Sequence, residues 1–124
     1  MSNDDVRVMV TVRIPVRIKQ QMTELLSSMG LGVSSYFSMA AKQLIVQKKV
    51  PFEFAVIKRG GQISKEPKVM TSFRIPVNVK QHLPVILHPM GLTISSYFVL
   101  AAEQLVVQKK IPFEFEALDI DDTK

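Results

Sequence analysis

The segment VMVTVRIP at residues 8–15 decides the fold of this chain, because it returns as VMTSFRIP at residues 69–76. The two copies lie 61 positions apart, and the correspondence runs without a gap to the PFEF motifs at 51–54 and 112–115. The sequence is therefore a tandem duplication. Both copies of the segment alternate in side-chain type, which is typical of a β-strand with one buried face.

The alternation assigns the strand residues to two faces. The face expected to enter a core carries Val10, Val12, Ile14, Thr71, Phe73 and Ile75. The opposite face carries Met9, Thr11, Arg13, Met70, Ser72 and Arg74. One face is thus suited to a core and the other to a partner.

The rest of each copy has the pattern of two amphipathic helices. After a strand over 7–14, apolar residues at helical spacing predict a helix over 16–28. Gly30 should end that helix, and a second helix should run over 33–48. The second copy repeats this pattern, except that Pro84 should bend or shorten its first helix.

A lone strand leaves two edges unpaired, so we expect the two strands to pair antiparallel and the four helices to cover their inner face. The predicted fold class is mainly α with one two-stranded antiparallel β-ribbon. Each copy has only about fifty residues and would bury little apolar surface alone, which favours one shared core. The predicted organisation is a single domain over 1–124, with a first repeat at 7–54, a linker at 55–68, a second repeat at 69–115 and an acidic tail at 116–124.

Charge and composition narrow the function. The formal net charge is +5, but residues 1–113 hold 15 basic and 6 acidic side chains, a balance that favours a polyanionic partner or serves solubility alone. The absence of cysteine excludes disulfides and thiolate zinc sites. His82 and His88 have no acidic residue or second histidine at the sequence spacing of metal ligands. We therefore expect no enzyme activity, metal or cofactor. With no signal peptide or apolar membrane span, the sequence predicts a soluble cytoplasmic protein.

The order of the motifs resembles the ribbon-helix-helix DNA-binding proteins, in particular the antitoxins of the RelB/DinJ type. The motifs that carry the resemblance are RIP at 13–15, MGL at 29–31, SS at 34–35 and KKVPFE at 48–53, followed by RIP at 74–76, MGL at 90–92, SS at 95–96 and KKIPFE at 109–114. The resemblance covers nearly the whole chain. It implies a tandem pseudo-dimer in the order β-α-α-linker-β-α-α, with Gly32 and Thr93 at the helix N-caps.

The resemblance also implies a DNA-binding site. The residues expected to contact bases in the major groove of double-stranded DNA are Met9, Thr11, Arg13, Met70, Ser72 and Arg74. Those expected to contact phosphates at the starts of the second helices are Gly32, Ser34, Ser35, Thr93, Ser95 and Ser96. The alternatives are that the arginines are solvated strand charges and that the serines only cap the helices.

The function that these features favour is a transcriptional repressor of its own or a neighbouring operon, acting on DNA as a single pseudo-dimer or as several associated ones. The main alternative is a protein-binding module that keeps the fold and recognises a toxin or another protein. Antitoxins of this type pair as homodimers of single units and continue into a long segment that wraps the toxin. Here one chain carries both units and ends nine residues after Phe115, so we expect it to retain DNA binding in particular.

Overall fold

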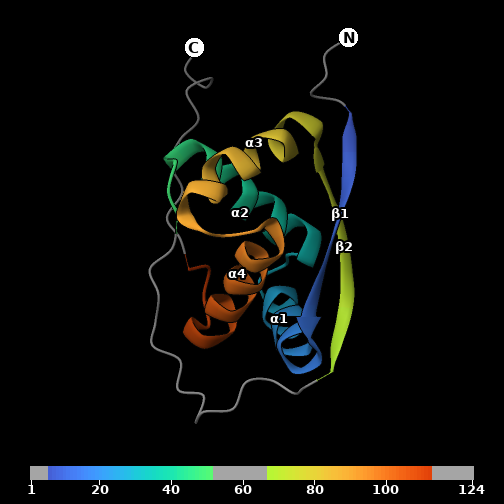
Figure 1. The fold of residues 1–124 in the computed structure, drawn as a ribbon. Helices are drawn as coiled ribbons and strands as arrows, with labels where there is room; N and C mark the ends of the chain where they lie inside the picture. Colours follow the sequence, from blue (N-terminus) through green and yellow to red (C-terminus); the bar gives the residue numbers. More distant parts are fainter. Residues whose placement is uncertain (1–5, 52–66, 113–124) are drawn as a thin grey trace, which may run out of the picture.

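The computed structural model of the chain describes residues 6–51 and 67–112 (Figure 1). Its elements, in order, are β1 (Arg7–Pro15), α1 (Val16–Ser28), α2 (Val33–Gln47), β2 (Lys68–Pro76), α3 (Val77–Leu87), the short 3₁₀ helix η2 (His88–Met90) and α4 (Ile94–Gln108). The described part is mainly helical, with one two-stranded sheet lying along one side of the four α-helices.

The two strands pair antiparallel, as the sequence predicts, with Thr11 opposite Ser72 at the centre. Their inner face enters the core: Val12, Ile14 and Ile75 are at most 1% exposed. The predicted alternation is confirmed on both strands, because the burial pattern switches at every residue from Met9 to Ile14 and from Met70 to Ile75.

A left-handed glycine follows the first helix of each repeat: Gly30 comes two residues after α1, and Gly91 comes directly after η2, which continues α3. Gly30 has φ +79° and Gly91 φ +77°, the left-handed region that favours glycine. The amide of Leu31 donates to the Leu26 carbonyl at 2.8 Å, and that of Leu92 donates to the Leu87 carbonyl at 3.1 Å. These bonds close the helix end in the manner of a Schellman motif. The predicted stop at Gly30 is confirmed.

Pro84 lies inside α3 without interrupting it. The helix is shorter than α1, with 11 residues against 13, but it continues for three residues past Pro84, so the shortening does not occur at that proline and a break there is not observed. Proline has no N–H to donate to the Lys80 carbonyl, but its fixed φ is compatible with a helix. The α-helical geometry ends at Leu87, two residues before Pro89, and the chain continues as η2.

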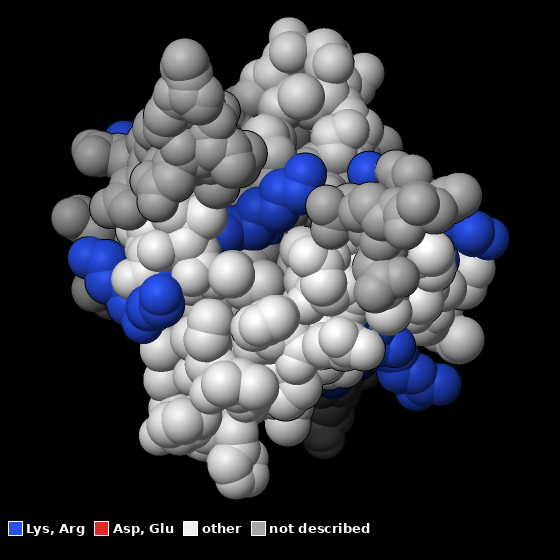
Figure 2. Space-filling view, turned by 90° about the horizontal axis from the view of Figure 1, so that it is seen from above, with Lys and Arg blue, Asp and Glu red and all other residues white. Residues whose placement is uncertain are grey.

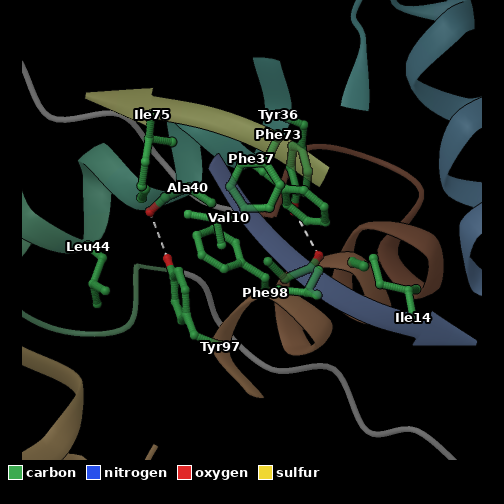
Figure 3. Packing of buried hydrophobic residues seen from close by; sticks show 14 of the residues in the cluster. Val10, Ile14, Tyr36, Phe37, Ala40, Leu44, Phe73, Ile75, Tyr97 and Phe98 are labelled. Carbon is green, nitrogen blue, oxygen red and sulfur yellow. Dashed lines mark hydrogen bonds between the residues drawn. The ribbon is translucent and has the colours of Figure 1, made fainter. Parts of the chain in front are cut away.

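The core is shared between the repeats (Figure 3). The hydroxyl of Tyr36 donates to the Ala101 carbonyl, and that of Tyr97 to the Ala40 carbonyl, each at 2.8 Å. Burial raises the pKa of both tyrosines well above the ordinary value of 10.0. These reciprocal bonds tie α2 to α4 at the centre of the molecule.

Aromatic rings fill the space between the sheet and these two helices. The ring centroid of Phe73 lies 4.9 Å from that of Phe37 and 4.9 Å from that of Phe98. The counterpart of Phe73 in the first repeat is Val12, so this cluster breaks the symmetry of the duplication.

The first helix of each repeat packs chiefly on the second helix of the other repeat. Thus α1 packs chiefly on α4, and α3 packs chiefly on α2.

Candidate nucleic-acid interface

The outer face of the sheet carries the six side chains predicted to contact bases. All six are exposed, and Met9 and Met70 are exposed by 50% and 62%. The hydroxyls of Thr11 and Ser72 hydrogen-bond to each other at 3.0 Å. The pairs across the sheet are Met9 with Arg74, Thr11 with Ser72 and Arg13 with Met70. The structure therefore brings the six residues onto one surface, related by an approximate twofold axis through the central hydroxyl pair.

Two further cations extend this surface, and sequence reasoning missed them. Arg7 lies opposite Pro76 and Lys68 opposite Pro15, so they stand at the two ends of the paired strands. Both are exposed and share the parity of the outward-facing residues. The signal was present in the sequence, because positions 7 and 68 are equivalent in the two repeats and both are basic.

Gly32 and Thr93 are the N-cap residues of α2 and α4, as predicted, but they differ as caps. The Thr93 hydroxyl accepts a hydrogen bond from the Ser96 amide at 3.0 Å and donates to the Ser96 hydroxyl at 2.9 Å. Gly32 offers α2 no side-chain cap. The first amides of an α-helix lack partners within the helix and carry the positive end of its dipole, so both helix starts favour an anion.

The outward strand residues and the start of α4 meet at one hollow of about 820 Å³. Arg13 lines it from β1, and Ser95 and Ser96 line it from α4. Ser34 and Ser35 occupy the equivalent exposed positions on α2. On the α4 side, therefore, residues from the two predicted contact sets border the same space.

Positive charge dominates the described part of the chain. Its acidic side chains are Glu24 and Glu103, of which Glu103 is buried, against twelve lysines and arginines. Figure 2 shows one face of the molecule with Lys and Arg side chains spread over it and no described acidic side chain in view. The long-range field of this body attracts anions.

The other sequence candidates add no site. The Nδ1 atom of His82 lies 2.7 Å from the Asn78 carbonyl oxygen in its own helix. Within residues 6–51 and 67–112, no group of three His, Asp or Glu side chains is placed to hold a metal ion. Glu53, Glu114 and most of the linker and PFEF motifs lie outside the described residues.

The helices of residues 6–51 and 67–112 are short for a membrane span. No single helix there is long and apolar enough to cross a bilayer, and only the pair Val77–Met90 and Ile94–Gln108, bent by 85°, passes jointly on length and composition. 

Comparison with known proteins places the chain in a family. The model of the RelB antitoxin family matches twice, over residues 7–62 and again over 68–124. Neither a curated protein nor a solved structure matches the chain. The RelB family is not a family of enzymes and suggests an antitoxin-like function. The two matches account for nearly all of the sequence, one for each repeat, so this chain belongs to the RelB antitoxin family as a tandem duplication.

Proposed function

We propose that this chain is a sequence-specific duplex DNA-binding protein, a tandem ribbon-helix-helix pseudo-dimer that inserts β1 and β2 into the major groove. The observation that carries the proposal is the exposed outer face of the sheet, where the same kinds of side chain recur on both strands. A two-stranded ribbon has the width that the major groove of B-DNA admits. The four cations of this face, at positions 7, 13, 68 and 74, suit a polyanion.

Each outward residue type has a partner on the base edges. The guanidinium groups of Arg13 and Arg74 present planar forks that fit O6 and N7 of guanine. The hydroxyls of Thr11 and Ser72 donate or accept hydrogen bonds, and a methionine contacts the methyl group of thymine. Because the central pair bond to each other at 3.0 Å, we assign the main sequence discrimination to the arginines.

The starts of α2 and α4 would fix the ribbon on the DNA backbone. Free amides in the first helical turn bind phosphate oxygens, and nearby hydroxyls add donors. The residues proposed for these contacts are Gly32, Ser34, Ser35, Thr93, Ser95 and Ser96. They position the ribbon, whereas the strand residues choose the sequence.

The approximate twofold axis implies a nearly palindromic operator. One chain supplies the readers of both half-sites, Arg74 with Met9 on one side and Arg13 with Met70 on the other. We propose that the whole chain acts as one domain built from the two repeats. Its role would be repression of its own or a neighbouring operon, by chains that associate further along the DNA.

Replacing Arg13 and Arg74 together by alanine tests this function. Each arginine–guanine contact contributes roughly 1–3 kcal/mol of discrimination, so selection of the operator should collapse. The core should be unaffected, because both side chains are exposed. The measurement is fluorescence anisotropy with the duplex upstream of the gene and with a random duplex. A folded double variant that still prefers the upstream duplex as the parent does would disprove the proposal.

The matched control removes two charges away from the ribbon. Lys48 and Lys49 follow the C-terminal end of α2, whereas the proposed phosphate contacts lie at its N-terminal end. Their replacement by alanine lowers the long-range positive field of the molecule, so it should weaken binding to all duplexes alike, most at low salt, with the preference for the operator retained.

A second candidate function is recognition of a toxin protein. The observation that favours it is the family match, which extends over both repeats. The two candidates give different results in a pull-down from cell extract with the arginine double variant. Loss of a captured protein together with an unchanged DNA preference would move the function to this candidate.

A further inference from the structure

The hollow between the ribbon and α4 has the size of a small-molecule site. Its volume of about 820 Å³ falls within the roughly 300–1,000 Å³ typical of ligand pockets. Leu92, Val99 and Leu100 form an apolar wall, and Met70 borders the hollow from β2. Met70 is 62% exposed, so its side chain is accessible to a molecule in the hollow.

Two cations border the same space. Arg13 and Lys68 line the hollow from β1 and β2. They are diagonal neighbours across the sheet, because Lys68 pairs with Pro15 and Arg13 with Met70. Neither has a hydrogen bond or an ion pair with any described residue. The hollow therefore combines an apolar wall with two positive charges that no residue within 6–51 or 67–112 pairs.

The equivalent surface of the first repeat differs at two of the three wall positions, and at one of them in polarity. The counterpart of Val99 is Ser38 on α2, and the counterpart of Leu100 is Met39. Val99 is half-buried: it packs against the hydrophobic core and also lines the hollow. The wall of the hollow on α4 is thus more apolar than the equivalent surface on α2.

We propose that this hollow binds a small amphipathic anion, a molecule with an aliphatic or aromatic body and a single phosphate or carboxylate group. The body packs on Val99, Leu100 and Met70, and the anionic group lies between Arg13 and Lys68. Because Arg13 also belongs to the proposed base-reading face, the bound anion and DNA exclude each other. This last step, release from DNA by a small ligand, rests on the proposed function; binding of the anion does not.

Octyl phosphate below its micelle concentration is a suitable probe, measured by isothermal titration calorimetry on the full chain. We expect one saturable site, with inorganic phosphate and 1-octanol each binding at least about tenfold more weakly, since each supplies one half of the recognition. Equal binding of inorganic phosphate would overturn the amphipathic assignment. Binding to phosphatidylglycerol vesicles without binding of monomeric octyl phosphate would replace the small ligand by a membrane surface.

Variants locate the site. Val99→Ser places in the wall the residue that the first repeat has at this position. It should weaken octyl phosphate binding about fivefold to tenfold, because one to two methyl groups lose their contact with the ligand. Lys68→Gln should weaken it by a similar factor and make it less sensitive to salt. Ser38→Val, the matched change on α2, should leave this site unchanged. Circular dichroism confirms that each variant folds, and unchanged affinity in both Val99→Ser and Lys68→Gln refutes the site.

Adding octyl phosphate to the DNA anisotropy assay separates the two proposals. Displacement of the upstream duplex supports both. Saturable octyl phosphate binding by a chain that binds no duplex keeps the ligand site and rejects the DNA function. A chain that binds the duplex and fails to bind octyl phosphate keeps the DNA function and rejects the ligand site.

Discussion

At the scale of single residues, Thr71 on the inner face of β2 is a polar side chain in the core. Its side chain is 5% exposed, and its hydroxyl has no hydrogen-bond partner among the described residues. A buried hydroxyl without a partner costs roughly 1–3 kcal/mol. The first repeat avoids this cost, because its equivalent residue is Val10.

Replacing Thr71 by valine should therefore stabilise the protein by about 1–2 kcal/mol, since the shape is kept and the unpaired hydroxyl is removed. Urea unfolding followed by circular dichroism measures the change. The reciprocal variant, Val10→Thr, should lower the free energy of unfolding by a similar amount. A Thr71→Val protein no more stable than the parent would show that the hydroxyl is satisfied in solution.

At the scale of secondary-structure elements, α1 and α3 are equivalent helices whose sequences differ at several positions, and the change to proline at position 84 bears most directly on helical hydrogen bonding. In α1, the hydroxyl of Thr23 donates to the Lys19 carbonyl at 2.7 Å. The equivalent residue in α3 is Pro84, which has no N–H for the Lys80 carbonyl. Pro84 is exposed, so its replacement disturbs little packing.

Pro84→Ala should raise the free energy of unfolding by about 1–3 kcal/mol, because alanine restores the helical hydrogen bond. The gain is reduced by the greater freedom of the unfolded chain. The matched change, Thr23→Pro in α1, should cost about 3 kcal/mol or more. Thermal unfolding of the two variants tests the pair, and a Pro84→Ala protein that melts below the parent contradicts the account.

The sequence predicts the helices and strands themselves well, but it does not predict which of them pack against each other. Alternation and helical spacing identify which side of each element is apolar, and left-handed glycines such as Gly30 mark helix ends. They do not reveal that α1 packs chiefly on α4, because periodicity says nothing about which partner covers a face. For the site, the six outward residues follow from parity alone. The hollow beside α4 depends on distances between elements that are remote in sequence, so no local pattern predicts it.

At the scale of the whole molecule, two hydrogen bonds join the halves. Tyr36 and Tyr97 are the two tyrosines of the chain, and each bonds a carbonyl of the other repeat. Their pKa values are raised above 10.0 by burial, so folding holds both side chains neutral. The resulting stability is complete below about pH 10 and is lost as the pH rises above it.

We therefore expect the free energy of unfolding to fall above pH 10 by up to roughly 2.7 kcal/mol per pH unit, as two tyrosines ionise only in the unfolded state. Urea titrations at several alkaline pH values measure the slope, and tyrosinate absorbance reports the ionisation itself. The double variant Tyr36→Phe, Tyr97→Phe should be less stable at neutral pH and should lose this contribution. Tyrosinate absorbance that rises near pH 10 in the folded protein would contradict the burial argument.

The interlocked packing of the repeats also sets an order of events during synthesis. Arg7 pairs with Pro76, and α1 packs chiefly on α4, which ends at Gln108. A ribosome adds about 5–20 residues each second, so the first strand waits several seconds for its partner. During that interval Val10, Val12 and Ile14 have no sheet to join. The nascent first repeat is thus open to chaperones and proteases until the second repeat has emerged.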